Sequence, residues 1–183
     1  MRVITGSCRG KKLKTLDTMD TRPTTDMVKE AMFSAVQFDV PAAKVLDLFS
    51  GSGQLGIEAQ RRGAAHCVFV DANPSAVAVI KENLSDCKLL KSSRVLNMDS
   101  FEYLKVAKNG FDIAFLDPPY GKGTLEKVLP ELEKLMEQGG IVVCEHEKEL
   151  ELPENVGRLS LHKRYKYGKI AVTIYKIPSE EEF

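Results

Sequence analysis

The sequence predicts an α/β fold built on a doubly wound, mostly parallel sheet, and two patterns carry this prediction. Between residues 44 and 144, short apolar stretches alternate with longer stretches of helical period, as in the β-α units of a parallel sheet. Beyond residue 144 the alternation stops, and residues 158–165 and 169–176 form two strand-like stretches joined near Gly168. These stretches favour an antiparallel hairpin at one edge of the sheet.

Five strands and four helices make up the alternating region. The strands are expected at residues 44–50, 66–71, 93–98, 111–116 and 141–144. The fourth strand is almost wholly apolar, as expected where helices cover both faces of a sheet. The helices are expected at residues 54–62, 74–87, 100–108 and 124–137. Pro74 fits the first turn of a helix, and the glycines at 63 and 139–140 are typical of helix ends.

The chain before residue 44 predicts a short extension and one further helix. Residues 1–16 are typical of a β-hairpin around glycine-containing turns. The threonines up to Thr25 are N-cap candidates for a helix that runs from Asp26 to about Phe38. We therefore expect an N-terminal basic β-hairpin extension over residues 1–22 and one main domain over residues 23–183.

Composition places the protein among ordinary globular chains. The 183 residues are 43% hydrophobic and 28% charged, which excludes a disordered, collagen-like or coiled-coil chain. The four cysteines form no CxxC pair, so a zinc site and a disulfide framework are not expected, and three of them fit small buried hydrophobes in a reducing compartment. No signal-peptide pattern and no apolar run of about 20 residues occurs. The sequence predicts a cytoplasmic protein without a membrane span.

Charge is balanced overall but unevenly distributed. Twenty-six basic and 26 acidic residues give a net charge of zero, yet residues 1–14 and 158–169 each carry five lysines or arginines and no acid. Two such stretches form a phosphate-facing surface if the fold brings them together. The simpler interpretation of both stretches is ordinary solvated strands with lysines at a sheet edge.

A glycine-rich turn follows the first strand of the alternating region. Residues 47–56 read DLFSGSGQLG and contain GxGxxG between an expected strand and helix, and Asp71 follows Gly51 by 20 residues. Glycines let a ligand approach the backbone, helix N–H groups face an anion, and an acid after the second strand accepts hydrogen bonds from ribose hydroxyls. This turn fits a dinucleotide or S-adenosylmethionine, and it also fits a turn that binds nothing.

Residues 117–120 read DPPY and follow the fourth strand. The two prolines remove two backbone donors and fix φ near −65°, and the first proline favours an extended Asp117. The resulting rigid loop offers acceptors and an aromatic face, which suits a planar amine that must be aligned with a methyl donor. The simpler alternative is a rigid β-α turn without a ligand. Each of the first four strands carries an acid in or just after its C-terminal part, at Asp47, Asp71, Asp99 and Asp117, and in such sheets these ends share one crevice.

These motifs resemble those of a known family. Residues 47–53 together with 117–120 resemble class I S-adenosylmethionine-dependent methyltransferases that modify exocyclic amines. The N-terminal RVITG with Arg9-Gly10, then the RPT at 22–24 and a late Tyr167-Gly168, make the whole chain similar to the RsmD-type 16S ribosomal RNA guanine-N2 methyltransferases. The resemblance implies a Rossmann-like class I methyltransferase fold, with residues 23–183 as the methyltransferase domain and residues 1–22 contacting RNA.

The resemblance also implies a set of site residues, carried over by position. The cofactor S-adenosylmethionine would be bound by Asp47, Phe49, Ser50, Gly51, Ser52, Gly53, Asp71, Asn73, Asp99 and Ser100. The target amine would be presented by Asp117, Pro118, Pro119 and Tyr120. RNA would be contacted by Arg2, Arg9, Lys11, Lys12 and Arg22. The implied partner is 16S ribosomal RNA or a small-subunit assembly particle. We expect a monomer, because a monomer suits docking on a large RNA. No metal is expected, because displacement at a sulfonium carbon needs alignment rather than a Lewis acid.

Other interpretations stay open at this point. Ser50, which is often alanine in the family, and Gln54 differ from the residues that are usual in the family. Glu145 is either a substrate contact or an ordinary solvated acid. The same chemistry could act on adenine in DNA or RNA, or on a protein glutamine, although the glutamine enzymes have Asn before Pro-Pro-Tyr. A nicotinamide-dependent oxidoreductase and a non-catalytic RNA-binding assembly factor are alternatives from other classes.

Overall fold

The computed structural model describes residues 2, 10–16, 25–108 and 110–179. Their strands form one eight-stranded sheet in the order β3-β2-β1-β4-β5-β8-β7-β6. The strands are β1 (Lys44–Asp47), β2 (His66–Asp71), β3 (Ser93–Asn97), β4 (Phe111–Leu116), β5 (Met136–Glu147), β6 (Asn155–Val156), β7 (Leu159–Tyr167) and β8 (Ile170–Lys176). The first five strands pair in parallel, and β8 and β7 continue the sheet as an antiparallel hairpin. The expected doubly wound sheet with a C-terminal hairpin is confirmed.

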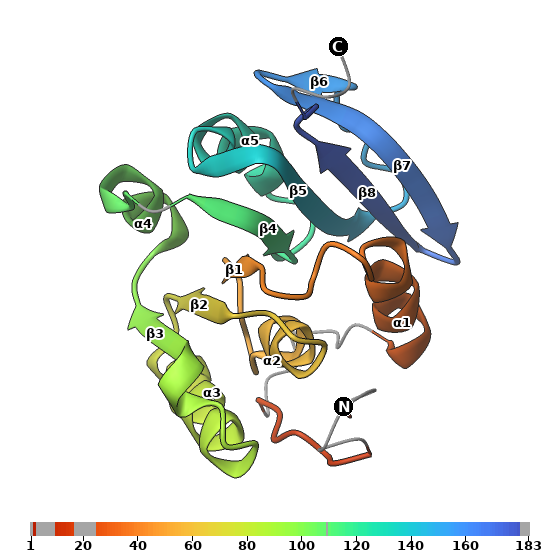
Figure 1. The fold of residues 1–183 in the computed structure, drawn as a ribbon. Coiled ribbons are helices and arrows are strands. Elements are labelled where there is room, and N and C mark those ends of the chain that lie inside the picture. The colour runs from red at the N-terminus through yellow and green to blue at the C-terminus, as the bar shows by residue number, and fades with distance from the viewer. Residues whose placement is uncertain (1, 3–9, 17–24, 109, 180–183) are drawn as a thin grey trace.

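Helices cover both faces of the sheet (Figure 1). The helices are α1 (Asp26–Ala35), α2 (Gln54–Arg61), α3 (Pro74–Asp86), α4 (Ser100–Val106) and α5 (Thr124–Glu133), with a 3-10 turn, η2, at Leu90–Ser92. Apolar residues of α1, α2 and α3 form one core cluster with one face of the sheet. Those of α4 and α5 form a second cluster with the other face. The near-continuous apolar strands β1 and β4 lie between these two layers, which explains why they lack alternation.

The strand register brings the polar strand ends to one edge. Asp47 pairs with Phe115 of β4 and Phe69 of β2, so Asp117 and Asp71 each follow the partner of Asp47 by two residues. Leu116 pairs with Cys144, which places Glu145 beside Asp117 on the next strand. The chain reverses its direction of winding between β1 and β4. In open α/β sheets this switch point is where ligands bind.

The expected boundary between the last helix of the alternating region and the strand after it is wrong. The fourth helix was expected to run to residue 137, but α5 ends at Glu133 and β5 begins at Met136. Met136 is buried and continues the apolar stripe of the helix, so periodicity alone does not separate the two elements. Gly139 has φ 75° and lies where the β4–β5 register shifts, so the glycine pair belongs to an irregularity within the strand rather than to a helix end.

Smaller differences occur at other element ends. The helix expected to reach Phe38 ends at Ala35, and Phe38 is 90% exposed. The first strand ends at Asp47, since the following residues form the glycine turn. The two-residue strand β6, which pairs with β7, was not expected.

The N-terminal hairpin is described only in part. Arg2 and Lys12 form an isolated antiparallel bridge, as a hairpin would. The turn of that hairpin and the expected boundary at residue 22 lie outside the described residues, so the division into 1–22 and 23–183 stays a prediction. Residues 10–16 do pack against the main domain, because Leu13 is 6% exposed and belongs to the core cluster on the α1–α3 face.

The expectation that three of the cysteines are buried is confirmed. Cys67, Cys87 and Cys144 are free thiols inside the protein, whereas Cys8 lies outside the described residues. Burial raises the pKa of the Cys67 and Cys144 thiols well above the ordinary value, so these groups stay protonated and unreactive. No helix in the described part of the chain has the length and apolar character needed to cross a bilayer.

Candidate active site

The glycine turn between β1 and α2 depends on backbone conformations that only glycine adopts easily. Gly51 has φ 54° and Gly53 has φ 81°, and Gly53 is the residue that precedes the first turn of α2. The N–H of Gly53 donates to the Ser50 carbonyl at 2.7 Å, which closes the turn. A side chain at either position would strain the turn.

Three side chains from different elements hold this turn. Asp71 at the end of β2 accepts from the Gly51 N–H at 2.8 Å, and Asp47 at the end of β1 accepts from the Gly56 N–H at 3.0 Å. Asn83 of α3 donates from Nδ2 to the Ser52 carbonyl at 2.9 Å. The turn is therefore shaped before any ligand arrives, and its shape depends on side chains from β1, β2 and α3.

Asp47 is a buried carboxyl. It is 1% exposed, and burial, with a smaller contribution from the charge of Asp71, raises its pKa from 3.8 to about 7, whereas the Gly56 N–H acts in the opposite direction. Such a group is partly protonated at neutral pH. Its observed contact is with the backbone of α2, which shows how an acid expected to hold the cofactor also shapes the turn.

Gly56, the third glycine of GxGxxG, lets α2 lie directly on the sheet. A Cβ atom at this position would meet the Phe69 ring at 2.3 Å and the Cys67 sulfur at 2.7 Å. Nearby, the Gln54 side-chain oxygen is buried and has no hydrogen-bond partner among the described residues. An unpaired buried acceptor beside the turn is costly, and it fits a ligand that brings a donor.

Two serines anchor the turn to the sheet. The Ser50 hydroxyl lies 2.5 Å from the Asp47 carbonyl oxygen and 3.2 Å from the Val70 carbonyl oxygen, and it accepts from the Val70 N–H at 3.0 Å. The Ser100 hydroxyl donates to the Leu48 carbonyl at 3.1 Å. Both residues are buried. Ser50, where the family often has alanine, therefore adds a link between β1 and β2.

Two expected cofactor residues act as helix N-caps. Asn73 caps α3 by accepting from Ser75 N at 2.9 Å, and its own N–H donates to Asp71 Oδ1 at 2.9 Å. Asp99 caps α4 through Oδ1, which accepts from the N–H groups at positions 101 and 102. Asn97, which sequence reasoning missed, donates to the Asp71 and Ala72 carbonyls at 3.0 Å. It is the last residue of β3, so a polar strand end was the available signal.

The DPPY loop leaves the same edge of the sheet from β4. Asp117 is half-buried, Pro118 is buried, and Pro119 and Tyr120 are exposed. The Tyr120 hydroxyl donates to Glu145 Oε1 at 3.2 Å. Glu145 is 2% exposed, so of the two interpretations of this acid, that of an ordinary solvated residue is excluded.

A small pocket lies between this loop and the end of β5. Its wall consists of Pro118, Pro119, Tyr120, Gly121, Lys122, Gly123, Thr124, Leu125, Glu126, Glu145, His146, Glu147 and Leu150. Three of these residues are glutamates and one is a lysine, so acceptors predominate. Glu147 also accepts from the Gly121 N–H at 3.1 Å, which holds the loop from the β5 side. Such a wall suits a ligand that offers N–H donors.

Comparison with known proteins decides the family. A family model described as "Conserved hypothetical protein 95" matches residues 1–176. The chain is 42% identical over 181 residues to the Bacillus subtilis protein "Putative rRNA methyltransferase YlbH", with 96% of this chain and 98% of that protein covered. It is 32% identical over 184 residues to ribosomal RNA small subunit methyltransferase D of Escherichia coli K12, with 100% and 92% covered. The chain belongs to the ribosomal RNA small subunit methyltransferase D family.

Solved structures agree with this membership. A structure titled "Putative methyltransferase yhhF from Escherichia coli" superposes with a TM-score of 0.87 at 32% identity, covering 98% of this chain and 99% of that chain. An RNA methyltransferase from Salinibacter ruber in complex with S-adenosyl-L-homocysteine has a TM-score of 0.67 at 21% identity, covering 87% and 95%. The latter likeness shows the fold alone. The fold of this methyltransferase D family member is thus the expected Rossmann-like class I fold.

The basic residues expected to contact RNA have different environments in this family member. Arg2, Lys11 and Lys12 are exposed, and Lys11 Nζ donates to the Asp86 carbonyl at 2.7 Å. Arg9 and Arg22 lie outside the described residues. RNA contact by these five residues stays a prediction.

The second basic stretch, residues 158–169, spans β7, and its arginines and lysines differ in their contacts. Arg158 bonds to the Glu133 side chain and carbonyl, and Arg164 donates to the Leu152 carbonyl at 2.9 Å. All basic residues of the stretch are exposed, and those other than the two arginines are His162, Lys163, Lys166 and Lys169. The arginines therefore hold the hairpin to its neighbours, and the lysines face solvent.

His146 forms a fixed part of the pocket wall. It is 1% exposed, its Nδ1 lies 2.8 Å from the Glu147 carbonyl oxygen, and its Nε2 lies 2.8 Å from the Thr173 hydroxyl. Burial lowers the pKa of this imidazole below its ordinary value. A neutral ring that donates from Nδ1 and accepts at Nε2 satisfies both contacts, so His146 supports the pocket rather than titrating in it.

Across the described residues, no group of three or more His, Cys, Asp or Glu side chains is arranged to hold a metal ion.

Proposed function

We propose that this protein transfers a methyl group from S-adenosylmethionine to the exocyclic N2 amine of a guanine in 16S ribosomal RNA. The observation that carries the proposal is the adjacency of two loops. The glycine turn and the DPPY loop follow the neighbouring parallel strands β1 and β4, whose register pairs Asp47 with Phe115, two residues before Asp117. Membership of the methyltransferase D family supports the same activity.

The residues around the glycine turn fit this cofactor. The turn with the N-terminus of α2 would receive the methionine end, where the unpaired Gln54 oxygen matches an ammonium donor. Asp71 would receive the ribose hydroxyls, and the exposed Asp99 with Ser100 the adenine amine. When bound, S-adenosylmethionine supplies an electrophilic methyl group on a sulfonium centre.

The DPPY loop would present the target base. Its wall of acceptors matches guanine, whose Watson–Crick edge offers the N1–H and N2–H donors. The Asp117 carboxylate would accept an N2–H, which directs the nitrogen lone pair toward the methyl group. As the new N–C bond forms, the sulfonium C–S bond would break and S-adenosylhomocysteine would leave. The nitrogen, then positively charged, would lose that proton to the Asp117 carboxylate. Tyr120 would stack on the base, which must leave its helix at a cost of about a few kcal/mol.

Binding partner and location follow from this substrate. We expect the exposed lysines near the N-terminus to contact phosphates of 16S ribosomal RNA or of a small-subunit assembly particle. A monomer suits docking on so large a substrate. The protein would act in the cytoplasm, where that RNA is assembled into subunits.

The test is a methylation assay with a mapped product. Purified protein, labelled S-adenosylmethionine and small-subunit RNA from cells lacking this gene should give one N2-methylguanine, located by mass spectrometry of RNA fragments. Parallel reactions contain duplex DNA and a release-factor protein. Label in adenine or in a protein glutamine would contradict the guanine assignment, and cofactor binding without label in any polymer would favour a non-catalytic assembly factor.

A further inference from the structure

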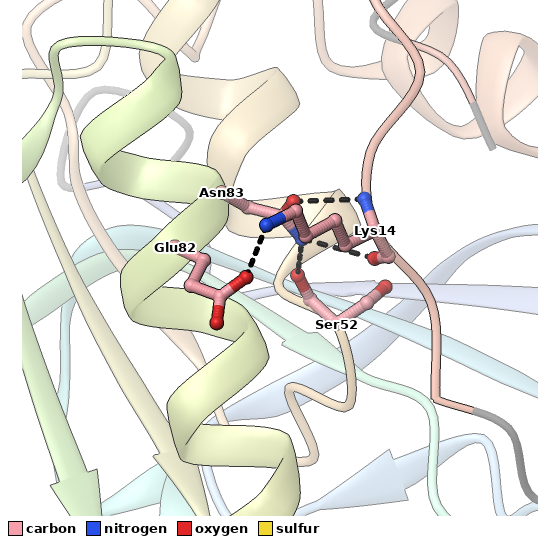
Figure 2. A network of polar contacts seen from close by, with 4 residues as sticks. All are labelled: Lys14, Ser52, Glu82 and Asn83. Carbon is pink, nitrogen blue, oxygen red and sulfur yellow. Dashed lines mark hydrogen bonds and ion pairs between the residues drawn. The ribbon is translucent and has the colours of Figure 1, made fainter.

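The side chain of Asn83 connects three segments that are far apart in the sequence. It comes from α3 and lies between the glycine turn and the N-terminal segment, here residues 10–16 (Figure 2). It is 1% exposed. A buried carboxamide is costly unless its polar atoms are paired, so its contacts indicate what it does.

Both ends of the carboxamide are used. Its Oδ1 accepts from the Lys14 N–H at 2.8 Å, and its Nδ2 donates to the Lys14 carbonyl at 3.0 Å and to the Ser52 carbonyl at 2.9 Å. An asparagine has two donor hydrogens, and these two carbonyls take both. On one side Asn83 thus pairs with the Lys14 backbone as a neighbouring strand would. On the other side it holds the centre of the glycine turn.

The N-terminal segment is attached to α3 through two lysines and packs into the core through Leu13. Leu13 is buried in the core cluster, Lys11 Nζ donates to the Asp86 carbonyl at 2.7 Å, and Lys14 Nζ forms an ion pair with Glu82. The ion pair is more than half exposed, so it contributes little to stability. The backbone contacts of Lys14 with Asn83 are therefore the specific link between this segment and the turn.

The peptide between Ser52 and Gly53 is fixed from both sides by these contacts. Its carbonyl accepts from Asn83, and its N–H donates to the Ser50 carbonyl at 2.7 Å. The flanking Gly51 and Gly53 have positive φ values, and glycine leaves such a peptide free to rotate unless hydrogen bonds hold it. The orientation of this peptide determines where the turn presents its backbone groups.

We propose that Asn83 is a positioning residue through which the N-terminal segment fixes the glycine turn for the methionine end of the cofactor. This inference rests on the proposed function, because it assigns the turn to S-adenosylmethionine. Asn83 itself does not touch the reacting atoms. Its effect should therefore be confined to ligands that carry the amino-acid part.

Two ligands separate this role from a general structural one. S-Adenosylhomocysteine carries the amino-acid part, whereas 5′-methylthioadenosine lacks its carboxylate and ammonium. Isothermal titration of wild type and Asn83→Leu should show about tenfold weaker S-adenosylhomocysteine binding, as expected for one hydrogen bond to a buried carbonyl. Binding of 5′-methylthioadenosine should change less than about twofold. Asn83→Asp, which keeps the acceptor for Lys14 and removes both donors, should give the same pattern and serves if the leucine variant does not fold.

Two further variants test the part played by the segment. Lys14→Pro removes the N–H that Asn83 accepts and should weaken S-adenosylhomocysteine binding selectively, by about three- to tenfold. Glu82→Gln is the matched control on the same helix. It breaks the exposed ion pair, keeps every backbone contact of Lys14, and should leave both affinities unchanged.

The outcomes separate the positioning role of Asn83 from the assignment of the cofactor. Equal losses for both ligands, or wild-type affinity in the Asn83 variants, would overturn the positioning role while leaving the cofactor assignment intact. Selective loss in the Asn83 variants but not in Lys14→Pro would overturn the link to the N-terminal segment. A wild-type protein that binds neither ligand would overturn the cofactor assignment, and this inference with it.

Discussion

The glycine turn and the DPPY loop lie at the same edge of the sheet, yet they are built in opposite ways. The turn is largely buried, and Asp47, Asp71 and Asn83 hold its backbone. The loop carries exposed residues from Pro119 to Gly123, and Tyr120 is 39% exposed. The first region is part of the core, whereas the second projects from it.

This difference indicates how the two ends of the site work. A small diffusible cofactor needs a preformed cradle, because binding energy spent on ordering the turn is lost from affinity. A base delivered by a large RNA needs an accessible loop whose rigidity comes from two prolines rather than from burial. Changes in the turn should therefore affect stability and cofactor binding together. Changes in the loop should mainly affect turnover, with small effects on stability and little effect on cofactor binding.

The largest expected effect is on turnover and comes from the loop. Asp117→Ala removes the acceptor for the target amine and should lower kcat by about 100-fold or more. The affinity for S-adenosylhomocysteine should stay within about twofold of wild type, because Asp117 belongs to the loop and not to the turn. Single-turnover methylation and isothermal titration measure the two quantities. Turnover near the wild-type rate would remove Asp117 from the mechanism.

The next effect is on the pH dependence of stability and comes from the turn. The pKa of Asp47 is raised from 3.8 to about 7, so between these values the folded protein binds more protons than the unfolded chain. Its free energy of unfolding therefore falls as the pH rises from about 4 to about 7, by at most about 4 kcal/mol for this group.

Asp47→Asn isolates this contribution. The amide oxygen still accepts from the Gly56 N–H, but the side chain no longer ionises. The variant should gain stability relative to wild type as the pH rises through this window. Urea unfolding at pH 4.5 and 7.5 measures the change, and a constant difference between the two proteins would contradict the raised pKa.

A third prediction concerns the contact of α2 with the sheet. Gly56→Ala places a methyl group 2.3 Å from the Phe69 ring and should lower the free energy of unfolding by about 1–3 kcal/mol. Gly121→Ala in the loop is the control, since its Cβ meets nothing within 4 Å and only its φ of 75° is unfavourable. It should cost about 1 kcal/mol. Equal losses in urea unfolding would remove the contrast between turn and loop.

The smallest effect concerns the edge of the loop. Tyr120→Phe removes the hydroxyl that donates to Glu145 but keeps the ring, so kcat/KM should fall less than about tenfold. Tyr120→Ala also removes the stacking surface and should cost about 10- to 100-fold. Steady-state methylation of the same RNA measures both. If the phenylalanine variant loses as much as the alanine variant, the hydroxyl rather than the ring holds the base.

Local chemistry explains which parts of the fold could be predicted. The strands 66–71 and 111–116 were predicted with the boundaries found, because an apolar run between polar or turn residues has one natural interpretation. The end of α5 could not be predicted in this way. Met136 is apolar on the helical stripe and on the strand alike, and only pairing with Phe111 decides between them.

The site shows the same division. The glycine turn, Asp71 and the DPPY loop are visible in the sequence because each depends on residues close in the chain. The role of Asn83 was not predicted from the sequence, although the sequence does contain a signal for it. Asn83 lies on the apolar stripe of α3 with Ala76, Val77, Ile80 and Leu84, and a polar residue at such a position marks a buried hydrogen-bonding group.

The sequence by itself determined the alternating order of strands and helices as far as β5, the two motifs and therefore the family. Those features arise from periodicity and from residues a few positions apart. Only the tertiary structure decided that an acid within β5 bonds to Tyr120, that Asp47 is buried enough to hold a proton near neutral pH, and that one carboxamide joins the N-terminal segment to the turn. Contacts and burial of this kind depend on which distant segments the folded sheet brings together, and no local pattern records that.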